Sequence, residues 1–134
     1  MCLIVNKEEF KIEAAQEDIV CYKVLENHRW FIQSPYRGFV YEIGKEYQTK
    51  IKPPAPAFRN NCQIGEGFHS FLNEADAKSE VGWVKDLKKW LKCPNSWHLC
   101  CYKCIIPKGT NVVYGKYNAK DTVVSEAIKV IEEV

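Results

Sequence analysis

Two glycines, a histidine and a serine come just before a strong helix start in the middle of the chain. Gly65 and Gly67 are followed by His69 and Ser70, and Asn73 is a favourable helix N-cap. Glycine permits positive φ and close approach of a ligand to the backbone, and a helix start offers unpaired N–H groups to an anion. A histidine also has a reference pKa suited to acid or base catalysis. The sequence therefore predicts a ligand cleft near His69, with His69 and Ser70 as contacts.

Three other side chains are candidate ligand contacts. Lys23, Tyr36 and Tyr114 could contact an anion or a ring of a ligand. The alternative interpretation is that they are ordinary surface residues of strands and loops. The sequence contains no complete catalytic motif that decides between the two.

Cysteine usage raises the question of a metal site. The chain has seven cysteines and no export signal, so we expect a cytoplasmic protein with reduced thiols. Cys93, His98, Cys101 and Cys104 are close enough in sequence to suggest zinc. Cys101 and Cys104 lie in a segment that reads as a strand, however, and would point to opposite faces of it. We therefore expect core thiols, with zinc as the alternative.

Composition limits the classes of function. The chain has 134 residues, of which 46% are hydrophobic and 13% aromatic, as expected for a single folded domain spanning 1–134. Its formal net charge of +2 is too small to attract nucleic acid at long range, which disfavours a nucleic-acid partner. No apolar run is long enough for a membrane span, so no membrane partner is expected.

Short β-branched and aromatic segments dominate the first half. Residues 19–25 read as a central strand, and 30–32 and 39–43 as further strands. The three prolines within 52–57 predict an irregular, extended loop.

The second half contains one clear helical pattern. Residues 73–91 have an N-cap, acidic residues in the first turn and apolar residues at helical spacing. Residues 99–106 read as a strand, a turn covers 107–110, and 111–115 continue as a strand. Residues 122–134 fit either a helical face or a strand, and we favour the strand. These elements predict an α+β fold: a bent antiparallel or mixed sheet with the main helix packed against it.

Short motifs along nearly the whole chain resemble a family of short uncharacterised bacterial and phage-associated proteins. That resemblance implies no activity. The residues that carry it are Met1-Cys2-Leu3-Ile4, Ile19 to Val24, Ser34-Pro35-Tyr36, Tyr41 to Lys45, Gly67 to Phe71 and Cys104 to Thr110.

A remoter similarity is to the ADP-ribosyltransferase fold. It is carried by the order of Tyr22-Lys23, Gly67-Phe68-His69-Ser70 and Ile106 to Thr110 followed by Ser125-Glu126. The resemblance implies NAD or another nucleotide as ligand, with Lys23 on a phosphate, Ser70 and His69 positioning the ligand, and Glu126 stabilising positive charge.

The chain departs from the pattern of that fold at three places. Lys23 stands where Arg or His is usual, Phe71-Leu72 replaces hydroxyl residues, and Ala127 replaces a second acid after Glu126. We therefore expect NAD chemistry to be lost. We predict no cofactor, with NAD or another nucleotide as the alternative.

Three functions are compatible with these features. The leading hypothesis is a small cytoplasmic binding or accessory domain with a ligand cleft near His69. The first alternative is a group-transfer enzyme, with His69 and Glu126 as its catalytic candidates, which requires Lys23, His69, Ser70 and Glu126 to surround one cavity. The second is a protein-interaction module with exposed aromatic residues, so the partner is either a small molecule or a protein.

Overall fold

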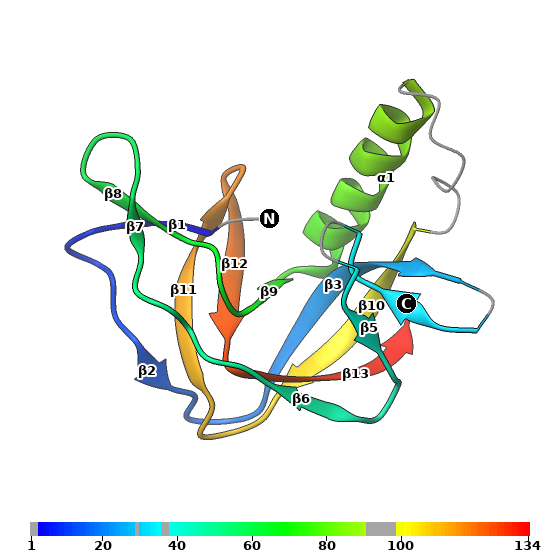
Figure 1. Ribbon diagram of the computed structural model, residues 1–134, viewed down its shortest axis with the longest axis horizontal. Helices are drawn as coiled ribbons and strands as arrows, with labels where there is room; N and C mark the ends of the chain where they lie inside the picture. The colour runs from blue at the N-terminus through cyan, green and yellow to red at the C-terminus, as the bar shows by residue number, and fades with distance from the viewer. Residues whose placement is uncertain (1–2, 29, 36–37, 91–98) are drawn as a thin grey trace.

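A computed structural model describes residues 3–28, 30–35, 38–90 and 99–134, and these residues are folded mainly as antiparallel β-structure (Figure 1). Strands make up 52% of the structure. The predicted α+β class is therefore wrong: the protein is mostly sheet. The helical pattern at 73–91 is the longest regular pattern in the sequence, whereas each of the many short strands gives only a weak signal. The sequence therefore indicates more helix and less sheet than the protein contains.

The described residues form thirteen strands and one helix. In chain order they are β1 (Leu3–Asn6), β2 (Glu13–Ala14), β3 (Ile19–Asn27), β4 (Ile32–Gln33), β5 (Val40–Tyr41), β6 (Glu46–Gln48), β7 (Ala55–Pro56), β8 (Asn61–Ile64), β9 (Phe68–Phe71), α1 (Glu74–Trp90), β10 (Leu99–Ile106), β11 (Asn111–Tyr117), β12 (Lys120–Ser125) and β13 (Ala127–Glu133).

The strands follow one continuous path of hydrogen-bonded neighbours, and every pairing is antiparallel. The order is β6-β13-β10-β3-β9-β12-β11-β1-β8-β7, with β2 beside β11 and with β4 and β5 forming an arm on β3. β12 and β13 are consecutive in sequence and are separated only by Glu126, yet three strands lie between them in this order. The central strands therefore curve until the two ends of their path meet at one sharp corner of the chain.

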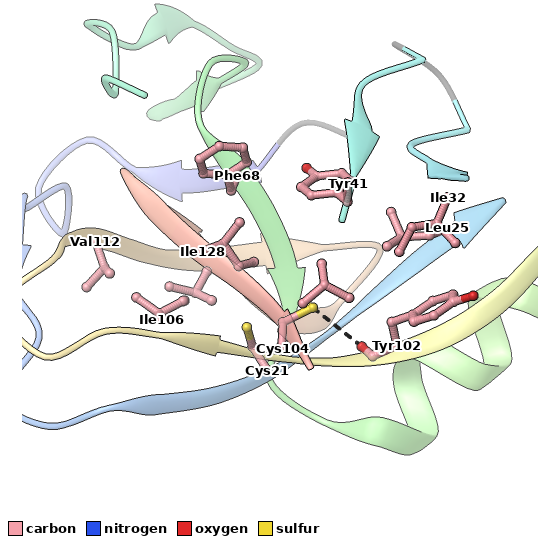
Figure 2. Close-up of a cluster of buried hydrophobic side chains, with 12 residues drawn as sticks. Cys21, Leu25, Ile32, Tyr41, Phe68, Tyr102, Cys104, Ile106, Val112 and Ile128 are labelled. Carbon is pink, nitrogen blue, oxygen red and sulfur yellow. Dashed lines mark hydrogen bonds between the residues drawn. The ribbon is translucent and has the colours of Figure 1, made fainter. Parts of the chain in front are cut away.

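The concave side of the curved strands holds the largest apolar cluster. Its side chains come from β3, β9, β10, β11, β12 and β13 and from the arm that covers them (Figure 2). Along β3, alternation places Cys21, Lys23 and Leu25 on this side. The buried members are Cys21, Leu25, Ile32, Tyr41, Phe68, Tyr102, Cys104, Ile106, Val112, Val123, Ile128 and Val130.

Helix α1 covers the opposite face of the same strands. Ala77 and Val81 pack with Phe71, Cys101 and neighbouring residues of β3. Asn73 caps the helix, since its Oδ1 accepts a hydrogen bond from Ala75 N at 2.8 Å. In the part of the chain that the structure covers, no helix has the length and apolar character that crossing a membrane requires.

Several predicted elements are confirmed and others are shorter than expected. The strand at 19–25, the helix at 73–91 and the strand at 99–106 correspond to β3, α1 and β10. The terminal segment is β-structure, as favoured, but it is broken into two strands at Glu126. The strands expected at 30–32 and 39–43 are reduced to the two-residue strands β4 and β5, and the loop at 52–57 contains β7.

Gly115 allows β1 to cross β11 closely. A Cβ at this position would lie 2.3 Å from Leu3 Cδ2 and 2.7 Å from the Ile4 carbonyl oxygen. We expect Gly115→Ala to lower the free energy of unfolding by about 1–3 kcal/mol, because backbone cannot yield as a flexible side chain can. Urea unfolding followed by circular dichroism measures the loss.

Gly82→Ala is the matched control for this substitution. Gly82 is exposed on α1 and has no neighbour within 4 Å of an added Cβ, so alanine should raise stability by about 1 kcal/mol. Equal effects of the two substitutions would contradict the close crossing at Gly115.

Candidate functional site

A cavity of about 270 Å³ lies where β3 and β9 separate. The two strands pair at a single position, Tyr22 with Phe71. The rest of β9 pairs with β12 on its other side and leaves a gap towards β3. The cavity is lined by residues from both faces of these strands, including Lys23 and Val24 of β3 and His69 and Phe71 of β9. It therefore passes into a split in the sheet, and Ser34, Phe39 and Tyr41 of the β4–β5 arm form part of its wall.

Lys23 is the central polar group of this cavity. Its side chain is carried to the concave side by β3, and the residue is only 8% exposed. Nζ donates a hydrogen bond across the split to the His69 carbonyl oxygen and lies 5.8 Å from the centroid of the Tyr41 ring. No carboxylate of the described residues forms an ion pair with it. Burial lowers the pKa of Lys23, and the neighbouring Cys104 and Cys21 sulfurs oppose that shift.

His69 lies beside Lys23, but its ring nitrogens face the main chain. Nδ1 is 3.1 Å from the Gly67 carbonyl oxygen and Nε2 is 2.9 Å from that of Ile64. Burial is the largest influence on the ring and lowers the pKa of His69 to about 4, with a further contribution from Lys23, although both carbonyl oxygens favour the charged form. A neutral ring donates to one carbonyl at a time. Through these two carbonyl groups, the His69 ring stabilises the turn before β9, and neither ring nitrogen is directed at a ligand.

Aromatic rings form the apolar wall of the cavity. Phe39 and Tyr41 come from the β4–β5 arm, and Phe68 from β9. The Phe39 and Tyr41 centroids are 4.9 Å apart, and those of Phe39 and Phe68 are 5.9 Å apart. Burial raises the pKa of Tyr41, so its phenol stays protonated at neutral pH.

The arm that carries this wall is held to β3 by polar contacts. Glu26 pairs with Gln33 in the β3–β4 register, and Gln33 Nε2 donates to Glu26 Oε2 at 3.0 Å. His28 Nε2 lies 3.0 Å from the same oxygen. Ser34 N donates to the Phe39 carbonyl oxygen at 2.9 Å and closes the turn. These bonds place Phe39 and Tyr41 over the split.

Gly67 has the positive φ expected for this stretch, at 121°. The room left by its missing side chain is filled by the protein, since an added Cβ would lie 2.4 Å from Val124 Cγ1. Gly65 has no positive φ and has open space around it. The absence of a side chain at Gly67 therefore lets Val124 of β12 pack against the backbone. The sequence had suggested that a ligand would approach the backbone there.

Of the four predicted ligand contacts that the structure describes, two share the cavity. Lys23 and His69 line it. Ser70 is fully buried beside them, and its Oγ, which has no hydrogen-bond partner, lies outside the lining. Tyr114 is on β11, is 42% exposed and does not line the cavity. Tyr36 lies outside the described residues.

Glu126 forms the corner between β12 and β13. Its Oε2 accepts a hydrogen bond from Ile51 N at 2.8 Å, and Oε1 accepts one from Asn111 Nδ2 at 3.0 Å. Its backbone is bonded to Asn111 O and Thr49 N. The Ile51 N–H is the main reason that the pKa of Glu126 is lowered. Glu126 lines a second hollow, with Lys108 and Asn111 among its neighbours there, so the four residues required for group transfer do not surround one cavity.

The zinc alternative requires two thiols that the fold separates. Cys101 faces α1, whereas Cys104 lies in the concave cluster and faces Cys21 across the β3–β10 pairing. The Cys104 thiol donates to the Tyr102 carbonyl oxygen, with sulfur and oxygen 3.7 Å apart (Figure 2). Cys93 and His98 lie outside the described residues. Within the parts of the chain that the structure describes, no group of three or more potential ligands could hold a metal ion.

Sequence reasoning missed the aromatic wall. The alternation of Phe39, Tyr41 and Ile43 was visible, but it indicated only a strand face. In the structure Tyr41 is buried over Lys23, whereas Ile43 is 59% exposed. Pairing of the arm with the end of β3, which has no local signature, brings the rings to the lysine.

Large apolar side chains are also exposed on and around the arm. Trp30 is 82% exposed, and four others in this part of the chain are more than one third exposed. Those four are Phe31, Phe39, Val40 and Ile43.

Comparison of the chain with protein families, with curated proteins and with solved structures finds no match. The function must therefore be argued from the cavity itself.

We expect His69 to remain neutral well below the pH at which histidine ordinarily titrates. Its folded-state pKa of about 4 lies below the unfolded value of 6.5, so the unfolded state binds more protons between them. Stability should accordingly decrease as pH falls from about 6.5 to about 4. Imidazole chemical shifts recorded against pH measure the midpoint, with the urea-unfolded protein as reference. A midpoint near 6.5 in the folded protein would contradict the buried, fastened ring.

Glu126→Gln should lower the free energy of unfolding at neutral pH by roughly 1 kcal/mol. The amide oxygen of glutamine is a weaker acceptor than a carboxylate oxygen, and its NH₂ group would face one of the two donors, Ile51 N or Asn111 Nδ2. The lowered pKa means that the carboxylate contributes stability above the ordinary value of 4.5, and that this is lost as pH falls through its lower folded value. Urea unfolding should therefore separate wild type from variant at about pH 7, and the difference should shrink steadily as the pH is lowered below 4.5. The exposed Glu132→Gln is the control and should behave like wild type across this range.

Proposed function

We propose that this protein is a small-ligand-binding domain whose cavity takes a planar ring that bears a carbonyl or carboxylate oxygen. One observation carries the proposal: a buried lysine without an acidic partner among the described residues lies at the wall of an aromatic cavity. Removing an ammonium group from water without a counter-charge costs free energy. A ligand oxygen at Lys23 Nζ would offset that cost.

The shape and lining of the cavity support a ligand of about one ring. Drug-sized ligands occupy pockets of about 300–1,000 Å³, and this cavity is slightly smaller, at about 270 Å³. Phe39, Tyr41 and Phe68 offer faces and edges for ring contacts. Phenylalanine and tyrosine rings supply the apolar part of the wall, and Lys23 is the one lysine among the described lining residues, so a ligand would be oriented by its polar end at Nζ.

The acidic side chains of the wall do not supply the missing partner. Glu80 of α1 is buried and lies 3.9 Å from Lys120, with which it forms an ion pair. Glu66 also lines the cavity, and no ion pair joins either carboxylate to Lys23. Group transfer has less support, because Glu126 is engaged at the corner by Ile51 and Asn111.

A charge-matched series of one-ring compounds tests the proposal. Benzoate and benzamide both carry an acceptor oxygen, whereas benzylamine carries a cation. We expect benzoate and benzamide to shift the amide signals of Tyr41, Phe68 and His69 in a saturable manner, and benzylamine to leave them unchanged. Titration followed by two-dimensional ¹H–¹⁵N NMR measures the affinities.

Lys23→Met should weaken benzoate binding by at least roughly tenfold, because a charge-assisted hydrogen bond is worth about 1.5–3 kcal/mol. Lys103→Met is the matched control: Lys103 lies on the neighbouring strand β10 and does not line the cavity. Circular dichroism verifies that both variants fold. Equal affinity of all three compounds, or the same loss in both variants, would contradict the proposed function.

A further inference from the structure

The state of the Lys23 side chain is unusual among the lysines of the described residues. Among the lysines whose side chains the structure describes, it is the only one that is buried. Burial lowers the pKa of Lys23, so its ammonium, which is the form that pairs with a ligand oxygen, gives up a proton more readily than that of an exposed lysine and leaves a nucleophilic amine. A neutral amine also keeps two N–H bonds.

The geometry around Nζ orients that amine. Donation to the His69 carbonyl oxygen uses one N–H and fixes the end of the side chain across the split. The Tyr41 ring lies 5.8 Å away on the cavity side. The amine is therefore held at the boundary between main chain and cavity, with the aromatic wall beside it.

We propose that Lys23 captures the carbonyl carbon of a small planar aldehyde or ketone in this cavity as an imine. This rests on the proposed function, since the same cavity must first accept the ring of the ligand.

The step balances without a further reactant. The Nζ lone pair forms a bond to the carbonyl carbon, and the carbonyl π electrons move to oxygen, giving a carbinolamine once a proton passes from nitrogen to oxygen. The second proton of nitrogen and the hydroxyl then leave as one water molecule, and the nitrogen lone pair closes the C=N bond. Neither partner is oxidised or reduced.

The lining favours retention of such an adduct. Lys23 is only 8% exposed, and the buried Tyr41 and Phe68 line the cavity with it, so little bulk water reaches the amine. Water is the reagent that reverses imine formation. Exposed lysines, such as Lys116 and Lys78, form ion pairs with Asp121 and Glu74 and are open to solvent, so water can reverse an imine formed there.

Reductive trapping with benzaldehyde tests the proposal. The folded protein is treated with one equivalent of benzaldehyde and cyanoborohydride at neutral pH, and the sites of benzylation are located by peptide mass spectrometry. We expect most of the label on Lys23 and little on Lys103. An excess of benzoate should protect Lys23, because both compounds occupy one cavity.

Lys23→Arg tests whether Lys23 is the captured residue. Arginine forms no imine under these conditions, so this variant should lose the dominant label, whereas Lys103→Met, which leaves the cavity lining unchanged, should keep both the label on Lys23 and the binding of benzoate. Label spread over surface lysines in the wild type, with benzoate still bound, would overturn imine formation and leave the proposed function standing. Absence of both benzoate binding and selective label would overturn both.

Discussion

The fold depends on the corner at Glu126. β12 and β13 lie at the two ends of the path β13-β10-β3-β9-β12, yet they follow one another in the chain. The two ends of the curved path are therefore joined covalently through a single residue, Glu126. Both the side chain and the backbone of Glu126 are bonded to the segment after β6 and to the start of β11. Main-chain groups that a sharp bend would leave unpaired are thereby satisfied.

That closure explains why the cavity exists. Along the curved path from β13 to β12, the weakest pairing is between β3 and β9, which share one paired position. The β4–β5 arm covers the resulting split on the concave side, and α1 lies on the other face. Lys23 reaches across the split to the main-chain oxygen of His69, two residues before the one β9 position that pairs with β3. The site is therefore a consequence of the curvature.

Local features of the sequence predict much of the secondary structure and part of the site. The run at 19–25, the capped helix at 73–91 and the strand at 99–106 follow from propensity and periodicity, which act within a few residues. His69 and Lys23 were recognised as candidates by type and context. Their proximity, the aromatic cover and the role of Glu126 depend on strand pairings between distant segments, and the chain carries no local signal for them. For the same reason the mostly β character was underestimated, because strands of two or three residues exist only through their partners.

The single pairing between β3 and β9 also bears on how the molecule moves. Strands on either side of that position form two extensively paired groups, one around β10 and the other around β12, and little main-chain bonding joins them except at the corner. Such groups open as separate cooperative units in native-state hydrogen exchange. A ligand that spans the split would replace the main-chain hydrogen bonds that β3 and β9 lack, so occupancy of the cavity would couple the two units into one.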